Sequence, residues 1–562
     1  MGTVSLPQDP RPEAESATPT TSEQLDEPAA TGPGWWARLL QRPVETRTVV
    51  ERLRPPMPGA LGGWVMVLVV TALAFLLRLW HLDHPHKLVF DEIYYAKDAW
   101  SILHHGYEVN WAPGADDLIA QGNVDQMLSS PAFVVHPPMG KLLIGVGEWM
   151  FGMTPFGWRF MAVVFGTLLV TTTMLLVRRL SRSNLVGGIA GLLLTVDGLA
   201  FTMSRLALLD IFQATFLVAA VGALVRDRDH MRARLADHLE SHGLEHLGDD
   251  LGPQLRWRPW RLLSGLLFGC SIATKWNSLY ALAAFAVLSL AWDVGARRLA
   301  GARRPLLRGL FRDGAPAFVQ LVVVATVAYG ASWTRWLTTE GGWSRHWAIQ
   351  NPEAPMARFL PDAVASLFAY HREIYQFHTG AYIKAATHPY AADPWGWLVL
   401  QRPLALDAVN DIQPGTNGCP PGTETCLQVI TALGTPLLWW TAAVALAAAI
   451  LFWIGLRDWR FSVPVVGALS MWLPWFQYTD RPLFYFYAIC IIPFTVSALA
   501  MFLGKILGPA GAGWRRVIGA IVVGAFVALV VLNFAYFWPI YTDQVLPWSH
   551  WWQRMWLGDA WV

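Results

Sequence analysis

Residues 88–100 read LVFDEIYYAKDAW, and they follow the first long apolar run of the chain, residues 61–80. The acidic pair Asp91 and Glu92 stands here among aromatic side chains, within about ten residues of an expected membrane boundary. Partial burial raises the pKa of a carboxyl group and makes its carboxylate a stronger base. Two interpretations are open for this stretch alone: a general base in an enzyme site, or an interfacial helix whose acids face water.

The composition of the chain indicates a membrane protein. Of its 562 residues, 54% are hydrophobic and only 15% are charged, whereas a soluble domain carries about 25% charged residues. The mean hydropathy is +0.35. A net charge of +2 is too small to argue for a nucleic-acid partner.

The first 60 residues differ from the rest of the chain. Residues 1–34 are rich in Pro, Thr, Ala, Glu and Asp, and we expect a disordered cytoplasmic tail without the pattern of a signal peptide. Residues 35–60 are basic and contain Trp35 and Trp36. We expect this segment to lie on a cytoplasmic leaflet that is rich in anionic lipid.

Apolar runs long enough to span a membrane, or nearly so, recur along residues 61–562, which we interpret as one transmembrane domain. The runs are 61–80, 158–177, 185–203, 210–225, 262–276, 278–294, 315–335, 436–456, 461–478, 483–503 and 517–538. They predict an all-α polytopic membrane protein with about 11 transmembrane helices. Residues 262–294 fit two short helices better than one long helix.

The distribution of arginine predicts the orientation. With the N-terminus in the cytoplasm, nearly every short arginine cluster lies on the cytoplasmic side, and the C-terminus lies outside. The loops 83–157 and 336–435 and the tail 539–562 are then extracytoplasmic. Cys419 and Cys426 share that side, where an oxidising compartment would allow a disulfide. The cytoplasmic loop 226–261 contains four histidines without a metal-binding spacing, and we interpret it as a solvated helix.

Charged and polar residues gather at the outer ends of the predicted helices. They are His136, Lys141, Arg159, Arg205, Asp210 and Lys275. Cations at that depth suit the phosphate of a membrane lipid, and a neighbouring carboxylate suits deprotonation of a hydroxyl group. We therefore expect Asp91 and Arg159 to face one cavity, with Arg205 and Lys275 as further phosphate-binding candidates. No phosphate-binding glycine motif of a nucleotide enzyme is present, which favours a lipid-linked donor.

Further candidates for lining the substrate site come from the same face. They are Tyr95, His371, His378, His388, Arg402, Asp480 and Arg481. The histidines have no zinc-binding spacing, so we predict no metal. The aromatic residues 484–487 are either interfacial anchors or part of a lipid or sugar pocket, and the sequence does not separate these alternatives.

Seven motifs in order resemble the protein O-mannosyltransferases, and most closely the bacterial, actinobacterial-type branch. The motifs are FDEIYYAKDAW, VHPPMGKLL, the helix start at Arg159, SRLALLD, YHREIYQFHTG, HPYAADPWGW and GTPLLWW. The resemblance extends from about residue 62 to residue 560. The large β-trefoil insert of the eukaryotic enzymes is absent from this sequence.

The resemblance implies a C-type glycosyltransferase fold in the cell membrane with its active site on the extracytoplasmic face. It implies inverting transfer of mannose from polyprenyl-phosphate-mannose to Ser or Thr of exported proteins, without a required cofactor. Asp91 matches the proposed base of the family. Glu92 would support Asp91 or hold the acceptor backbone, and Arg159 matches a functionally important arginine. The general secretion channel is an implied partner.

Two alternatives differ in acceptor or in class. A related polyprenyl-phosphate-sugar transferase would use a glycan or lipid acceptor with the same donor chemistry. A transporter would place its charges near the middle of the bilayer and would carry internal repeats, and neither feature is evident in this sequence.

Overall fold

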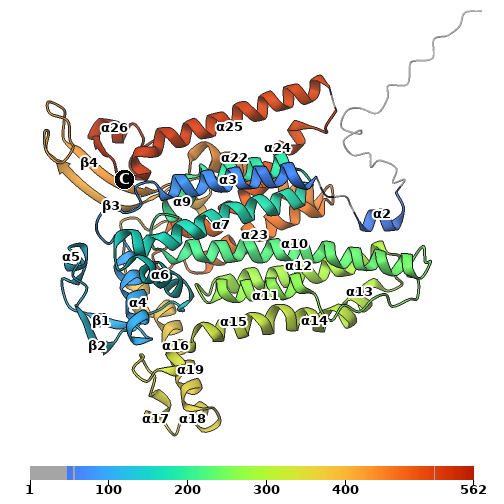
Figure 1. The fold of residues 1–562 in the computed structure, drawn as a ribbon, viewed down its shortest axis with the longest axis horizontal. Coiled ribbons are helices and arrows are strands. Elements are labelled where there is room, and N and C mark those ends of the chain that lie inside the picture. The colour runs from blue at the N-terminus through green and yellow to red at the C-terminus, as the bar shows by residue number, and fades with distance from the viewer. Residues whose placement is uncertain (1–46, 55–56, 58, 512) are drawn as a thin grey trace, which may run out of the picture. The chain divides into compact units, whose positions relative to one another are not determined.

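The computed structural model describes residues 47–54, 57, 59–511 and 513–562. The predicted tail 1–34 lies outside the described residues, and so do Trp35 and Trp36 of the predicted interfacial segment. The described chain is mainly helical, and Figure 1 shows that the long helices α3, α7, α10, α12 and α25 run roughly parallel to one another.

Seven helices in the described part of the chain are long and apolar enough to cross a membrane. They are α3 (Ala60–Leu79), α7 (Pro155–Ser181), α10 (Leu209–Ser241), α12 (Ser278–Leu299), the continuous helix 305–332, α22 (Pro436–Ile454) and α25 (Trp514–Tyr541). Helix 305–332 consists of α13 (Pro305–Gly309), α14 (Ala315–Phe318) and α15 (Val324–Ser332), joined by two π-helical segments.

The other four apolar runs form shorter helices. They are α8 (Asn184–Thr195), α11 (Pro259–Ile272), α23 (Ser462–Trp472) and α24 (Ile492–Leu507). Each of the eleven predicted runs therefore contains a helix, while the number of membrane crossings stays a prediction. Residues 262–294 contain two helices, as expected, and residues 273–277 form the break between α11 and α12.

Short helices occupy the connections at the end of the bundle where α7 and α10 begin. The first connection contains α4 (Glu92–His105), α5 (Ala115–Ala120) and α6 (Met139–Phe151), and α9 (Gly198–Met203) follows α8. The later connections contain α16 (Thr334–Thr338), α17 (Trp347–Gln350), α18 (Pro355–Phe359), α19 (Asp362–Thr379), α20 (Ala381–Ala385), α21 (Pro394–Trp397) and α26 (Trp548–Trp552).

Two small antiparallel sheets correct the all-α prediction. The first sheet pairs β1 (Val109–Trp111) with β2 (Met127–Pro131). The second has the order β3–β4–β5, with β3 (Leu404–Ile412), β4 (Cys426–Ala432) and β5 (Val545–Pro547). Figure 1 shows both sheets at the same end of the helices as α4. Strands this short lie in connections between apolar runs, so hydropathy alone does not reveal them.

The region 226–261 is not the solvated helix that the sequence suggested. Helix α10 continues to Ser241, and its later turns bury Met231, Leu235 and Leu239. A short helix, α2 (Val49–Leu53), packs on this extension and buries Leu53 in the same cluster. This part of the basic segment therefore lies on protein, because its apolar side chains find partners on α10 and α12.

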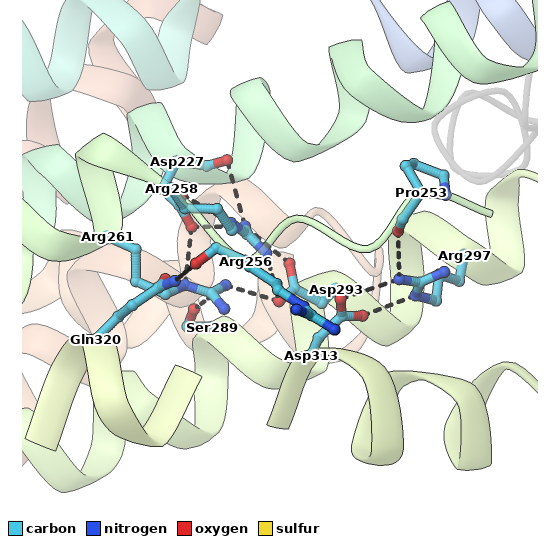
Figure 2. A network of polar contacts seen from close by, with 10 residues as sticks. All are labelled: Asp227, Pro253, Arg256, Arg258, Arg261, Ser289, Asp293, Arg297, Asp313 and Gln320. Carbon is cyan, nitrogen blue, oxygen red and sulfur yellow. Dashed lines mark hydrogen bonds and ion pairs between the residues drawn. The ribbon is translucent and has the colours of Figure 1, made fainter. Parts of the chain in front are cut away.

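Buried ion pairs join the middle of α10 to the start of α11 and to the last turns of α12. Arg258 and Arg261 lie between Asp227 and Asp293, with nitrogen–oxygen distances of 2.6 to 3.0 Å (Figure 2). Arg297 pairs with Asp313 at 2.7 Å in the same network. Three guanidinium groups thus face three carboxylates, which compensates the cost of burying each charge.

Candidate active site

Two adjoining cavities lie where α10 begins and where α11 is separated from α12. The larger cavity has a volume of about 450 Å³, and the smaller has about 320 Å³. His136, Lys275 and Tyr487 line both cavities, so the two spaces meet at these side chains. Asp91 lines the smaller cavity, whereas Asp210 lines the larger one.

Asp91 precedes the first residue of α4 and lines the smaller cavity. Burial raises the pKa of Asp91 to about 6, although the nearby ammonium group of Lys275 opposes this rise. The Tyr95 hydroxyl donates a hydrogen bond of 3.3 Å to Asp91 Oδ2. A carboxylate with this pKa is a stronger base than an exposed aspartate and is still largely ionised at neutral pH.

Glu92 and Arg159 form a buried clamp beside Asp91, and each is fully buried. Arg159 donates to both oxygens of Glu92, at 2.9 and 2.8 Å. Glu92 also accepts hydrogen bonds from the backbone N–H groups of Val89 and Ala207. This arrangement joins the turn before α4 to α7 and to the residues just before α10.

The clamp corrects two expectations. Arg159 also donates to the carbonyl oxygens of Leu82, Pro85 and Lys87, so its donors are used within the protein. It lines neither cavity. The expected cavity shared by Asp91 and Arg159 is therefore absent from the described structure, and Glu92 has no free oxygen to hold an acceptor backbone. Both residues instead fix the turn that carries Asp91 against α7.

Lys275 is the cation that faces Asp91. It lies in the break between α11 and α12, and its Nζ is 2.7 Å from Asp210 Oδ2. The same Nζ lies 5.2 Å from the centre of the Tyr487 ring. Asp210 is the second residue of α10, so the ion pair connects the start of α10 to the end of α11. Lys275 therefore brings a positive charge to the junction of the two cavities.

Arg481 supplies a second cation, in the larger cavity. Its Nη1 lies 3.4 Å from His378 Nδ1, and the other ring nitrogen of His378 lies 3.0 Å from the Val135 carbonyl oxygen. Burial lowers the pKa of His378 to about 4, so this ring is neutral at physiological pH. Arg481 forms no ion pair within the described residues, and its buried Nε has no hydrogen-bond partner there.

His136 lies at the junction of the cavities, and its ring is 6.2 Å from the Tyr95 ring and 5.5 Å from the His378 ring. Burial and the charge of Lys275 lower its pKa well below the ordinary value. His136 is therefore a neutral ring at physiological pH, and its predicted contact with the donor phosphate or sugar stays a prediction.

Two other predicted phosphate contacts are engaged elsewhere. Arg205 donates to the carbonyl oxygens of Arg78, Trp80 and His81 and thereby caps the end of α3. Lys141 is buried against Glu108 and Asp98. Neither side chain lines the two cavities. Intramembrane cations can satisfy protein carbonyls and carboxylates as well as a ligand, and sequence position does not separate these uses.

Some of the predicted lining residues line a cavity, and others do not. Tyr95 and His388 line the smaller cavity, and His378 and Arg481 line the larger one. His371 bonds to Tyr329 and stacks on Trp276, outside both cavities. Arg402 holds the carbonyl oxygens of Asp559 and Ala560, and Asp480 forms an exposed ion pair with Lys384. The last three side chains therefore line neither cavity, and a role for them in substrate binding stays a prediction.

Aromatic and amide side chains that the sequence did not assign complete the walls. Phe484, Phe486 and Tyr487 belong to the run 484–487 and line the smaller cavity, which favours the pocket interpretation of that run. The larger cavity adds Asn277, Tyr280, Tyr375, Trp475 and Tyr478. The sequence offered one signal for Asn277, because it lies two residues after Lys275 in the predicted break between two helices.

Two further predictions concern metal and disulfide. Among the residues the structure describes, no group of three or more His, Cys, Asp and Glu side chains is arranged to hold a metal ion. Independence from metal stays a prediction about the reaction. Cys419 and Cys426 are joined by a disulfide at the tip of the β3–β4 hairpin.

The fold and the site together define a class of protein. The chain is a multi-pass membrane protein with an acid and cations in adjoining cavities at one end of its helices. Its fold matches a solved S. cerevisiae protein O-mannosyltransferase Pmt1–Pmt2 complex bound to the sugar donor. The TM-score is 0.66 at 13% identity, and the match covers 91% of this chain and 94% of that chain. This is the C-type glycosyltransferase fold.

Sequence comparisons then give the family. The family model for dolichyl-phosphate-mannose-protein mannosyltransferase matches residues 68–300, and the model for the C-terminal four-helix membrane region of protein-O-mannosyltransferase matches residues 363–561. A polyprenol-phosphate-mannose–protein mannosyltransferase from Mycobacterium tuberculosis is 39% identical over 92% of this chain and 97% of its own length. One from Corynebacterium glutamicum is 34% identical, over 82% of this chain and 85% of its own length. The chain belongs to the protein mannosyltransferase family of glycosyltransferases.

Proposed function

We propose that this enzyme transfers mannose from polyprenyl-phosphate-mannose to Ser or Thr hydroxyl groups of exported proteins. The observation that carries the proposal is the meeting of the two cavities at Lys275, with a base on one side and Arg481 on the other. The actinobacterial relatives have names that specify the same donor and a protein acceptor. Their names favour a protein acceptor over the glycan or lipid acceptor of the alternative hypothesis.

The proposed reaction is a single displacement with inversion at the anomeric carbon. The acceptor hydroxyl enters the smaller cavity, and Asp91 takes its proton while the oxygen attacks the anomeric carbon. The bond from that carbon to the phosphate oxygen breaks, and polyprenyl phosphate leaves with the bonding electrons. The hydrogen bond from Tyr95 orients the Asp91 carboxylate for this step.

The leaving phosphate is the group that needs stabilisation by charge. Arg481 is suited to this role, because it lines the larger cavity, its neighbour His378 is neutral and no carboxylate pairs with it within the described chain. Lys275 adds positive charge at the junction, although Asp210 offsets part of that charge. Preorganised cations that face developing negative charge give one of the largest catalytic effects.

The predicted orientation places this reaction on the extracytoplasmic face. Arg303 and Arg304, in an arginine cluster that predicts a cytoplasmic side, directly precede α13, and Asp91 directly precedes α4. Figure 1 shows α13 and α4 at opposite ends of the long helices. Association with the general secretion channel also stays a prediction. It would fit this orientation, because protein chains that emerge from the channel would present their hydroxyl groups on this face.

The decisive experiment compares the wild type with Asp91→Asn in proteoliposomes that contain polyprenyl-phosphate-mannose and a Thr/Pro-rich peptide. Loss of the base should lower transfer by about 100-fold or more, while gel filtration and the unfolding temperature show an intact fold. Transfer at the wild-type rate would remove Asp91 from the role of base. Mannose on a glycan or lipid acceptor but never on the peptide would favour the alternative acceptor.

A further inference from the structure

A third cavity lies at the opposite ends of the helices that form the candidate active site. It has a volume of about 220 Å³, and α3, α7, α10 and α11 line it. On α10, Asp210 and Arg226 are 16 residues apart, which corresponds to about 24 Å along a helix. That distance approaches the thickness of the hydrocarbon core, about 30 Å, so this cavity lies near the other membrane surface.

Three arginines line this cavity, and within the described chain only one of them, Arg179, is paired with a carboxylate. Arg226 forms no ion pair within the described residues, and its guanidinium carbon lies 4.0 Å from the centre of the Trp260 ring. Arg178 donates to the uncharged Asn184 side chain and lies over Trp64 at 5.8 Å. Arg179 shares the single carboxylate of Asp229 with Arg182. The cavity therefore has an excess of positive charge.

The neighbouring network in Figure 2 provides the contrast. There Arg258, Arg261 and Arg297 face three aspartates, and each cation is compensated. Trp260, beside Arg226, lies between Arg258 and Arg261 in the sequence, yet no aspartate is supplied to Arg226. An unpaired cation at a protein–lipid boundary is suited to an anion from the membrane.

The other side chains that line the cavity are mainly apolar. Leu175 and Leu176 come from α7, Ala219 and Ala223 from α10, and Leu263 and Leu267 from α11. Gly222 also lines the cavity, and a Cβ atom there would meet no other atom within 4 Å. The concave surface on α10 thus provides space for an acyl chain directly below the arginines.

We infer that this cavity binds one anionic glycerophospholipid, with the phosphate on Arg226 and Arg178 and an acyl chain along Gly222. Trp64 and Trp260 lie at the depth of the headgroups, where such rings are favoured. The lipid would bridge four helices whose other ends carry the Glu92–Arg159 clamp, Asp210 and Lys275. Its position at the far membrane surface distinguishes it from the lipid-linked donor, whose phosphate belongs beside Lys275.

The test is native mass spectrometry of the full-length protein, purified in detergent and titrated with phosphatidylglycerol, phosphatidylcholine or a polyprenyl phosphate. We expect the first bound phosphatidylglycerol to dissociate at least tenfold less readily than phosphatidylcholine. Arg226→Gln should weaken its binding by about fivefold, the effect of one basic residue near a membrane surface. Gly222→Leu should fill the groove and weaken binding by more than tenfold.

Gly524→Leu is the matched control, because Gly524 lies on α25, away from this cavity, and also faces open space. It should bind phosphatidylglycerol as the wild type does. Equal affinity for phosphatidylglycerol and phosphatidylcholine, or unchanged binding in both Arg226→Gln and Gly222→Leu, would overturn the inference. Displacement of the bound phosphatidylglycerol by polyprenyl phosphate at equal concentration would also overturn it. If Gly222→Leu fails to fold, the phosphatidylglycerol affinity of Arg226→Gln, a substitution at the protein surface, tests the inference by itself.

Discussion

Asp91 shows how much a few neighbours determine at the scale of one residue. Its carboxylate lies at the edge of a cavity, receives a hydrogen bond from Tyr95 and faces the ammonium group of Lys275. Burial and these contacts determine how basic Asp91 is. The adjacent Glu92 instead accepts hydrogen bonds from Arg159 and from two backbone N–H groups. Adjacent acids in the sequence thus have different surroundings: Asp91 lines a cavity, and Glu92 is held in a buried ion pair.

The pH dependence of transfer should report the ionisation of Asp91. Because burial raises its pKa to about 6, the base is protonated and inactive at lower pH. We expect kcat/KM to be level above about pH 7 and to fall tenfold per pH unit below about pH 6. His136 and His378 have lowered pKa values and stay neutral in this range, so they should add no second acidic limb. A rate that stays level down to pH 5 would contradict this assignment.

Arg481 should control recognition of the donor phosphate. We expect Arg481→Gln to lower kcat/KM by about 10- to 100-fold, because a charged hydrogen bond contributes about 1.5–3 kcal/mol. Lys384→Gln is the control, since Lys384 lies nearby in an exposed ion pair with Asp480 and should change the rate less than twofold. Steady-state kinetics with varied polyprenyl-phosphate-mannose measure both variants. Equal effects of the two substitutions would indicate a general loss of positive charge and not a phosphate contact.

At the scale of elements, the site depends on how the turn before α4 is held against α7. The Glu92–Arg159 clamp is fully buried and satisfies three backbone carbonyls as well as two backbone N–H groups. Helix α4 itself is short, so its position relative to α7 comes from this contact and from packing on α6. The break between α11 and α12 similarly directs Lys275 toward the cavities.

Breaking the clamp should destabilise the protein and displace Asp91. Removal of one partner leaves a buried charge, so we expect Arg159→Gln to lower the free energy of unfolding by about 3–5 kcal/mol and to reduce transfer strongly. The double variant Glu92→Gln with Arg159→Gln should recover part of the stability, because no unpaired charge remains. Thermal unfolding in detergent measures this cycle. The exposed pair of Arg303 and Asp249 is the control, and Arg303→Gln should have no measurable effect.

At the scale of the whole molecule, the two ends of the helices have different chemistry. One end carries the two cavities and both small sheets, and the other carries the paired network and the basic cavity. This polarity is consistent with a protein that has one face toward the exported acceptor and another toward the cytoplasm.

Labelling from one side of the membrane tests that polarity. In a Cys270→Ser background, Asn351→Cys should react with a membrane-impermeant maleimide in intact cells, because Asn351 is exposed between α17 and α18. Arg303→Cys should react only after the cells are permeabilised. The reverse pattern would place Asp91 in the cytoplasm and would rule out exported proteins as acceptors.

Sequence alone determined where the helices form and which acid to examine. The eleven apolar runs each contain a helix, and 262–294 divides in two, because hydropathy and helix periodicity are local properties. The aromatic surroundings of Asp91 likewise indicated a raised pKa before its partners were known. The strands of the two sheets escaped notice because they lie in the connections between apolar runs, and only β5 pairs with a distant strand.

Only the tertiary structure decided which cations face the cavities. Arg159, Arg205 and Lys141 occupy helix ends as Lys275 does, yet they turn toward carbonyls and carboxylates of distant segments. Lys275 and Arg481 instead face open space that those segments leave between them. The direction of a long basic side chain depends on the partner that folding places opposite it, and that partner is not encoded by neighbours in the sequence.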